Sequence, residues 1–241
     1  MRLIGMLGGM SWESTAEYYR LANELVRERL GGVHSARILL DSVDFAEIEA
    51  LQATAEWERA GELLAGRARA LQDGGADLLV LCTNTMHKVA DAIERAVSVP
   101  LVHIADATAR AVRSAGLARV GLLGTAFTME QDFHRDRIAS HGLEVIVPDP
   151  ADREVVHRVI YHELVRGIVR DESRAAYQQV IGRLAGQGAE GVILGCTEIE
   201  LLIGAADSPI PVFPTTRIHV EAAVEQALAG VSTRSTGTAV G

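Results

Sequence analysis

The stretch GADLLVLCT at residues 75–83 decides the fold, because it occurs a second time as GAEGVILGCT at residues 188–197. Each copy is a short apolar run that ends in a cysteine and a threonine. The only two cysteines of the chain, Cys82 and Cys196, take the same place in both copies. Short apolar runs of this kind are typical of buried parallel strands, so the stretch predicts two equivalent strands, each followed by a helix.

The flanking sequence repeats in the same order. LIGMLG at 3–8 resembles RVGLLG at 119–124, and VPLV at 99–102 resembles IPVF at 210–213. Gly5 precedes Cys82 by 77 positions and Gly121 precedes Cys196 by 75, a period too long for a solenoid. We therefore expect an α/β fold of two similar lobes, each a mostly parallel sheet flanked by helices. The lobes should be related by a pseudo-twofold axis, with the active site between them.

The expected elements follow from the alternation of apolar runs with helical periodicity. Strands are expected at 3–7, 36–40, 78–82, 101–104, 120–123, 144–147, 191–196 and 212–213, and helices at 13–29, 55–71, 84–97, 129–140, 153–166, 173–187 and 219–228. We place the first lobe at 1–103 plus 214–230, the second at 104–213, and a mobile tail at 231–241.

Composition limits the class of protein. The 241 residues are 48% hydrophobic, which is enough to form a core. Their formal charge of −9 disfavours binding to nucleic acid. No run of 18 apolar residues is present, so we expect no membrane span. Two cysteines do not make a disulfide framework, which indicates free thiols and a cytoplasmic protein.

The position of the cysteines suggests their chemistry. Ligands of parallel sheets bind outside the carboxyl ends of the strands, where both cysteines lie. A following helix N-terminus is expected to lower the pKa of each thiol. Racemisation needs a base on one face of a carbon and an acid on the other. Two lobes that each offer one sulfur to a shared cleft meet this need, so Cys82 and Cys196 are the candidate catalytic pair.

The residues beside the cysteines are candidates for binding the substrate. We assign Thr83, Asn84, Thr85 and Thr197 to the α-carboxylate and the charge that develops during proton removal. Glu198 either binds the substrate ammonium or is only a favourable charge in a first helical turn.

No cofactor or metal is expected. The chain lacks the G-x-G-x-x-G and G-x-x-x-x-G-K-[ST] phosphate-binding patterns and spacings of histidine typical of zinc sites. Lys88 is the only lysine and has no Schiff-base context. The pair Gly8 and Gly9 is expected to let the backbone approach a ligand closely.

At three motifs the sequence resembles the aspartate/glutamate racemase family, and particularly its broad-specificity amino-acid racemases. The motifs are GGMSWEST at 8–15, CTNTMH at 82–87 and GCTEI at 195–199, and the resemblance runs from residue 1 to about 228. It implies a cofactor-independent racemase, commonly a homodimer, that acts on a small amino acid through Cys82 and Cys196. It also implies that Met10 and Gln52 line the substrate site with the 82–84 turn, opposite Thr197 and Glu198.

The chain departs from the aspartate-specific members of that family at two places. Those enzymes are expected to hold the side-chain carboxylate with an Arg after the second strand and a Lys near 160–164. Here residues 44–49 contain no basic residue and Val165 stands where the Lys is expected, with Arg166 next to it. The sequence thus favours neutral or several substrates.

Two other functions remain open from the sequence. One keeps the fold and changes the reaction to that of a hydantoin racemase, a related cysteine-dependent isomerase or a decarboxylase. The other is a small-molecule binding protein with inert thiols, although such a protein does not need its cysteines at symmetric positions.

Overall fold

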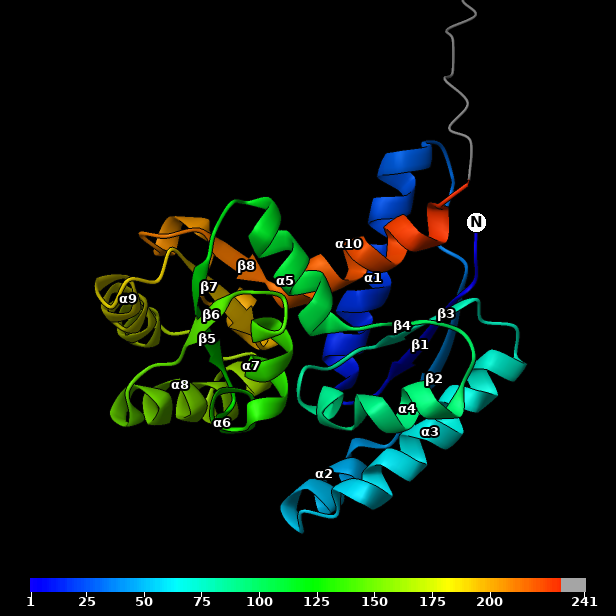
Figure 1. Cartoon of the computed structure of the whole chain (residues 1–241), viewed down its shortest axis with the longest axis horizontal. Helices are drawn as coiled ribbons and strands as arrows, with labels where there is room; N and C mark the ends of the chain where they lie inside the picture. The colour runs from blue at the N-terminus through cyan, green and yellow to red at the C-terminus, as the bar shows by residue number, and fades with distance from the viewer. Residues whose placement is uncertain (231–241) are drawn as a thin grey trace, which may run out of the picture.

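The computed structural model describes residues 1–230 and contains two four-stranded parallel sheets (Figure 1). The first sheet has the order β2-β1-β3-β4, from β1 (Ile4–Gly8), β2 (Ile38–Ser42), β3 (Leu78–Leu81) and β4 (Leu101–Val102). The second has the order β6-β5-β7-β8, from β5 (Arg119–Gly124), β6 (Glu144–Ile146), β7 (Gly191–Gly195) and β8 (Val212–Pro214). All six strand pairs are parallel. The predicted two-lobed α/β fold is therefore confirmed.

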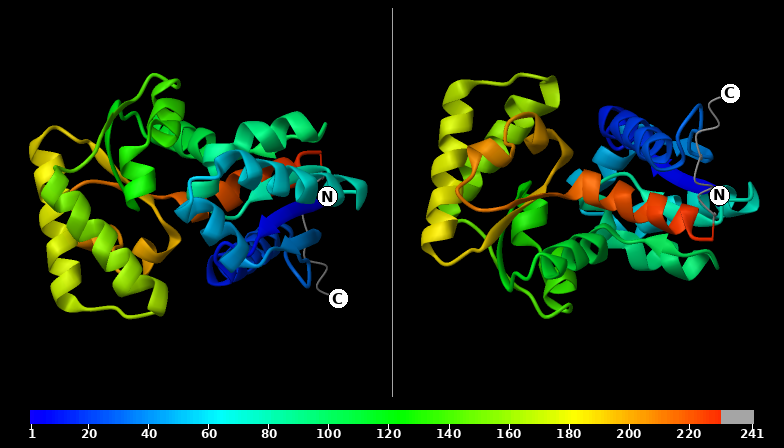
Figure 2. Two further views of the ribbon diagram at one scale, coloured as in Figure 1. Left: turned by 90° about the horizontal axis from the view of Figure 1, so that it is seen from below. Right: turned by 90° about the horizontal axis from the view of Figure 1, so that it is seen from above.

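Helices flank both sheets (Figures 1 and 2). They are α1 (Trp12–Leu30), α2 (Phe45–Ala53), α3 (Trp57–Asp73), α4 (Ala90–Ala96), α5 (Ile104–Ser114), α6 (Ala126–Glu130), α7 (Asp132–Ala139), α8 (Pro150–His162), α9 (Asp171–Gly186) and α10 (Thr215–Leu228). Short 3₁₀ turns occupy Thr85–Val89 (η1), Leu164–Arg166 (η2), Thr197–Leu201 (η3) and Ala205–Asp207 (η4).

Helix α1 shows how local sequence sets an element that leads into the site. Ser11 caps it by accepting a hydrogen bond from the Ser14 amide at 3.3 Å, and Gly31 ends it with a φ of 76°. Tyr18, Leu21, Ala22, Leu25 and Val26 recur at helical spacing and are buried. They pack in a core with strands β1 and β3 and with α10.

The duplicated glycines of β1 and β5 have the same packing role. A Cβ on Gly5 would lie 2.7 Å from Leu79 and 2.8 Å from Ala76. A Cβ on Gly121 would lie 2.9 Å from Leu184 of α9. In both lobes, side chains on a neighbouring strand, loop or helix fill the space that glycine leaves over the central strand.

Helix α10 follows the last strand of the second sheet and packs against α1 and α5 (Figure 1). Its end is tied to the start of the chain, since the Arg2 amide donates to the Ala227 carbonyl at 2.9 Å. This contact agrees with assigning 214–230 to the first lobe, but the exact lobe boundaries remain a prediction. The expected mobile tail at 231–241 lies outside the described residues. No helix within 1–230 is both long and apolar enough for a membrane span.

Candidate functional site

A cavity of about 780 Å³ opens at the carboxyl ends of β1, β3, β5 and β7, so both lobes contribute to it. All the predicted substrate-binding residues line it, namely Met10, Gln52, Thr83, Asn84, Thr85, Thr197 and Glu198. Of the two cysteines, Cys196 lines the cavity and Cys82 does not. The structure thus gathers the predicted residues at one place, with one exception.

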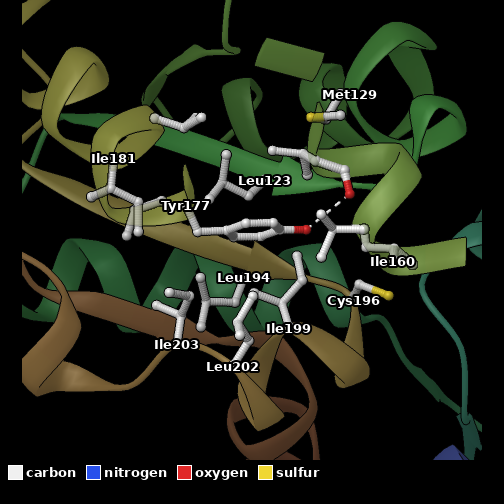
Figure 3. Packing of buried hydrophobic residues seen from close by; sticks show 14 of the residues in the cluster. Leu123, Met129, Ile160, Tyr177, Ile181, Leu194, Cys196, Ile199, Leu202 and Ile203 are labelled. Carbon is white, nitrogen blue, oxygen red and sulfur yellow. Dashed lines mark hydrogen bonds between the residues drawn. The ribbon is translucent and has the colours of Figure 1, made fainter. Parts of the chain in front are cut away.

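Cys196 lies directly after β7, at the edge of the buried core of the second lobe. Figure 3 shows its sulfur directed away from the Tyr177 ring at the centre of that core. The thiol donates a hydrogen bond to the Glu198 carboxylate at 2.9 Å. Glu198, for which the sequence left open a role in binding the substrate ammonium, is therefore engaged with the Cys196 sulfur.

Cys82 is fully buried and does not line the cavity. Its amide donates to the Leu7 carbonyl of β1 at 2.9 Å, and its thiol contacts the Val80 carbonyl at 3.8 Å, which is long for a hydrogen bond. The next three residues, 83–85, line the cavity, so the backbone of Cys82 is one residue away from it.

The expected lowering of both thiol pKa values is wrong. Burial raises the pKa of Cys82 and of Cys196, and for Cys196 the neighbouring Glu198 carboxylate raises the pKa further. Both cysteines are followed by 3₁₀ turns of five residues, η1 and η3, and η1 continues directly into α4. The effect of burial on both thiols therefore exceeds any stabilisation of a thiolate by the helical turns that follow.

The amide of Asn84 is oriented by a chain of hydrogen bonds between the lobes. Thr215 donates to the Leu194 carbonyl at 2.8 Å, so its oxygen accepts from Asn84 Nδ2 at 3.1 Å. The other amide atom, Oδ1, is buried and has no hydrogen-bond partner within residues 1–230. A buried unpaired acceptor in the wall of a cavity favours a ligand that donates.

His87 fixes the turn that carries these residues. Its Nδ1 lies 2.7 Å from the Thr83 carbonyl, which can only accept, so Nδ1 carries the proton. Its Nε2 then accepts from the Ile104 amide at 3.2 Å. The buried imidazole thereby ties the Cys82 turn to the first residue of α5, where the chain crosses between the sheets.

Two further predicted residues, Thr197 and Gln52, make polar side-chain contacts. Thr197 makes hydroxyl contacts with Ser14 of α1 at 2.8 Å and with Thr216 of α10 at 3.0 Å. Gln52 donates to the Met86 sulfur at 3.0 Å. These contacts hold the lining of the cavity together from both lobes.

The glycine pair of the first turn has a packing role and does not itself line the cavity. Gly9 has a φ of 93°, and a Cβ there would lie 2.2 Å from the Val43 carbonyl oxygen. A Cβ on Gly8 would lie 2.4 Å from the Thr15 side chain. The backbone that approaches closely is that of the β2–α2 loop, which brings α2 to the cavity.

The cavity wall also includes Val165 and Arg166, which the comparison with aspartate-specific members already singled out. Sequence reasoning did not assign the rest of the wall, namely Ser11, Trp12, Glu13, Ser14, Phe45, Glu49, Thr125, Ile160, Tyr161, Leu164, Gly167, Gly195 and Leu201. The repeat could have indicated Thr125, because it follows β5 as Gly9 follows β1. Residues 11–14 and Gly195 lie in two of the sequence motifs, whereas the walls from α2, α8 and η2 carry no local pattern that separates them from ordinary helix residues.

No set of three or more His, Cys, Asp or Glu within 1–230 is placed to hold a metal ion. The polar groups of the cavity are hydroxyls, amides and carboxylates together with the thiol of Cys196 and the guanidinium of Arg166. This is a set suited to binding and proton transfer.

Comparison with known proteins places this cavity in a family context. A family model described as Asp/Glu/hydantoin racemase matches residues 7–223. The structure of a proposed Asp/Glu racemase from Yersinia pestis is 55% identical, with a TM-score of 0.91 over 95% of this chain and 100% of that one. An aspartate racemase homologue from Pyrococcus horikoshii is 36% identical, with a TM-score of 0.85 over 94% and 99%. The broad specificity amino-acid racemase RacX of Bacillus subtilis is 25% identical over 66% of this chain and 68% of its own.

Proposed function

The chain belongs to the Asp/Glu/hydantoin racemase family and is an isomerase of the racemase type, and from this premise we propose that Cys82 and Cys196 exchange the α-proton of an amino acid without a cofactor. The observation that carries this proposal is the shared cavity at the carboxyl ends of two equivalent strands. Each of these strands ends beside a cysteine, and each cysteine comes from a different lobe.

In the proposed reaction, the thiolate of one cysteine removes the α-proton and the electron pair of the C–H bond stays on the α-carbon. The thiol of the other cysteine then gives a proton to the opposite face. Because the roles reverse in the return direction, the working pair holds one thiol and one thiolate and titrates as a unit.

Formation of the thiolate is coupled to substrate binding. Burial favours the neutral thiols, whereas the positive charge of a bound α-ammonium would favour a thiolate. Cys82 has to turn from Val80 to reach the cavity. Little is lost when it does so, since the contact it leaves is a weak one at 3.8 Å.

The binding roles divide between hydroxyls and carbonyl-type oxygens. Thr83, Thr85 and Thr197 line the cavity with hydroxyls that can donate to the α-carboxylate. Asn84 Oδ1 can only accept, so it suits the α-ammonium rather than the carboxylate. The Glu198 carboxylate accepts a hydrogen bond from the Cys196 thiol. When that thiol loses its proton, the carboxylate is released to bind the α-ammonium.

Broad specificity, a homodimer and a cytoplasmic location belong to the same proposal. Glu49, rather than a basic residue, comes from the 44–49 segment to the cavity, which supports substrates other than aspartate. The homodimer follows from the family resemblance, and light scattering coupled to size-exclusion chromatography tests it. The two free thiols suit a reducing compartment.

The test is proton exchange in D₂O. The purified protein is incubated with a panel of L-amino acids, α-hydrogen loss is followed by NMR, and D-isomer formation by chiral chromatography. Both are expected for some panel members, and Cys82→Ser and Cys196→Ser should each reduce racemisation by orders of magnitude without loss of fold. Near-normal racemisation by either variant would overturn the two-base mechanism. Activity on a hydantoin or maleate alone would reassign the reaction.

A further inference from the structure

Three hydroxyls form a row that leads from the cavity into the contact between α1, η3 and α10. Ser14 of α1 and Thr197 of η3 both line the cavity, and their hydroxyl oxygens lie 2.8 Å apart. The Thr197 hydroxyl also lies 3.0 Å from that of Thr216, the second residue of α10. Ser14 and Thr216 are buried, so the protons of this hydroxyl row need partners within the protein or in the cavity.

The hydroxyl row ends at the carboxylate of Glu200, which the proposed proton transfer does not use. Glu200 follows Thr197 by three positions in the 3₁₀ turn η3, and side chains at this spacing lie one above the other. Glu200 is therefore on the face of η3 that contacts α10. There the amide and the hydroxyl of Thr216 offer hydrogen bonds to the carboxylate. That amide has no partner within α10, whose N-cap residue Pro214 gives no side-chain cap.

The surroundings of Glu200 do not favour a permanent charge. Its Oε1 is buried and has no hydrogen-bond partner among residues 1–230. Burial raises the pKa of Glu200 to about 7, although the hydrogen bonds from Thr216 act in the opposite direction. The charged and titratable groups that interact with it are Glu17 and Tyr18 of α1, Arg217 of α10 and Cys196 before η3. Near neutral pH, Glu200 therefore exists both with and without its proton.

The charge of Glu200 sets the direction in which the hydroxyl row donates. An ionised carboxylate can only accept, so it takes the proton of Thr216, and the Thr216 oxygen then accepts from Thr197. The single proton of the Thr197 hydroxyl is thereby used inside the protein. A neutral carboxyl group instead donates to the Thr216 oxygen, and Thr216 donates to Thr197. The Thr197 proton is then free to point into the cavity.

We propose that Glu200 is a positioning residue which, by holding or releasing one proton, determines whether the Thr197 hydroxyl donates to the α-carboxylate of the substrate. This inference rests on the proposed racemase function of the same cavity. Glu200 does not line the cavity, so it acts through Thr216 and Thr197. Its neutral form is the one that binds substrate, and binding above neutral pH is therefore linked to the uptake of a proton by Glu200.

NMR tests whether Glu200 holds and releases a proton in the required range. The side-chain carboxyl carbons of glutamate are labelled with ¹³C and followed between pH 6 and 8.5. The resonance of Glu200 is the one that Glu200→Gln removes, and it should titrate with a pKa of about 7. A Glu200 carboxyl that does not titrate in this range would overturn the inference, whatever the enzyme does.

The KM of the best substrate of the panel is measured over the same pH range. In the unmodified protein, KM should rise roughly 5- to 30-fold from pH 6 to 8.5, because the neutral fraction of Glu200 falls and the hydrogen bond from Thr197 is lost with it. Glu200→Gln keeps an uncharged donor at this place, so its KM should stay low throughout. A variant that is only damaged in its fold would not bind substrate better than the unmodified protein at pH 8.5.

Thr216→Val separates the hydroxyl row from the effect of charge alone. It removes the hydroxyl that links Glu200 to Thr197 and should abolish the rise of KM as well. Glu17→Gln is the matched control, because Glu17 acts on Glu200 by charge and is not part of the row. Its rise of KM should remain and move to lower pH, since the Glu17 carboxylate raises the pKa of Glu200. A rise of unchanged size in Glu200→Gln or Thr216→Val would overturn the inference.

Failure of the racemase proposal gives a different result. Absence of exchange with every amino acid would overturn that proposal. Binding is then measured without turnover, as the concentration of each amino acid that half-protects Cys196 from iodoacetamide at pH 6 and 8.5. The inference requires weaker protection at pH 8.5 in the unmodified protein and equal protection at both pH values in Glu200→Gln. Absence of any protection would overturn both.

Discussion

At the scale of single residues, the unpaired oxygen of Asn84 is the feature that calls most directly for a ligand. We predict that Asn84→Ala lowers kcat/KM about 10- to 100-fold, as expected for loss of a hydrogen bond to a charged group. Steady-state kinetics on the best substrate of the panel measures the loss. Thr215→Ser keeps the hydroxyl that orients the amide and should retain most activity. Unchanged kcat/KM in Asn84→Ala would remove Asn84 from the binding site.

The contact between Glu198 and Cys196 gives a second prediction at this scale. Because the carboxylate raises the pKa of the thiol, Glu198→Gln should lower that pKa and move the rise of alkylation rate with pH to lower pH. Iodoacetamide labelling is read in a Cys82→Ser background, so that only Cys196 reacts, with Cys82→Ser alone as the control. A shift to higher pH would contradict this account of the thiol.

At the scale of elements, the packing of α9 on β5 can be tested with two glycines. Gly121→Ala places a methyl group 2.9 Å from Leu184 and should destabilise the protein by about 1–3 kcal/mol, as for overpacked cores. Gly182→Ala is on α9 itself, where nothing lies within 4 Å of the added Cβ, and should stabilise by about 0.5–1 kcal/mol. Urea unfolding measures both, and a similar effect of the two variants would show that the contact with Leu184 does not matter.

The elements also show what the sequence could and could not predict. All eight strands were predicted, and the central ones most directly, because parallel strands buried on both faces leave continuous apolar runs such as 78–81. Helix α2 was missed, since it is nine residues long and only Ile48 and Leu51 are buried, so the period is too short to detect. Helix α5 was missed because small alanines dominate its buried face. The predicted helix at 129–140 is divided between α6 and α7 at Gln131, which has an extended backbone.

The sequence likewise predicted one part of the candidate site and not another. The repeat located Cys82, Cys196 and the polar residues beside them, because these lie at strand ends that the pattern marks. The repeat could not reveal that the Cys82 thiol is buried against the Val80 carbonyl and does not line the cavity, since this depends on a side-chain orientation. The positions of α2 and η2 in the cavity wall depend on tertiary packing, such as the contact of the Gly9 turn with Val43. No local sequence pattern encodes such packing.

At the scale of the whole molecule, buried imidazoles join elements that are far apart in the sequence. His87 connects the Cys82 turn to α5, and His219 of α10 donates to the Val102 carbonyl while it accepts from the Tyr18 hydroxyl of α1. The His87 ring lies 4.5 Å from that of His103 and 5.6 Å from that of His219, centroid to centroid. The rings therefore need to be neutral, because protonation would remove their acceptor atoms and place like charges together.

This cluster predicts that the fold is lost in mild acid. Burial lowers the pKa of His103 to about 3 and that of His134 and His219 to about 4, from an ordinary value of 6.5, and also lowers the pKa of His87. Because the folded-state pKa values are lowered, the stabilisation is complete above about pH 6.5 and is lost as the pH falls toward 4 and 3. By pH 5 the loss in the free energy of unfolding is on the order of 2 kcal/mol for each imidazole.

Urea unfolding at pH 7.5, 6.5, 5.5 and 5 should show a steep fall in the free energy of unfolding. His219→Gln should flatten that fall, whereas the exposed His34→Gln should not, and equal slopes in the three proteins would show that acid acts elsewhere.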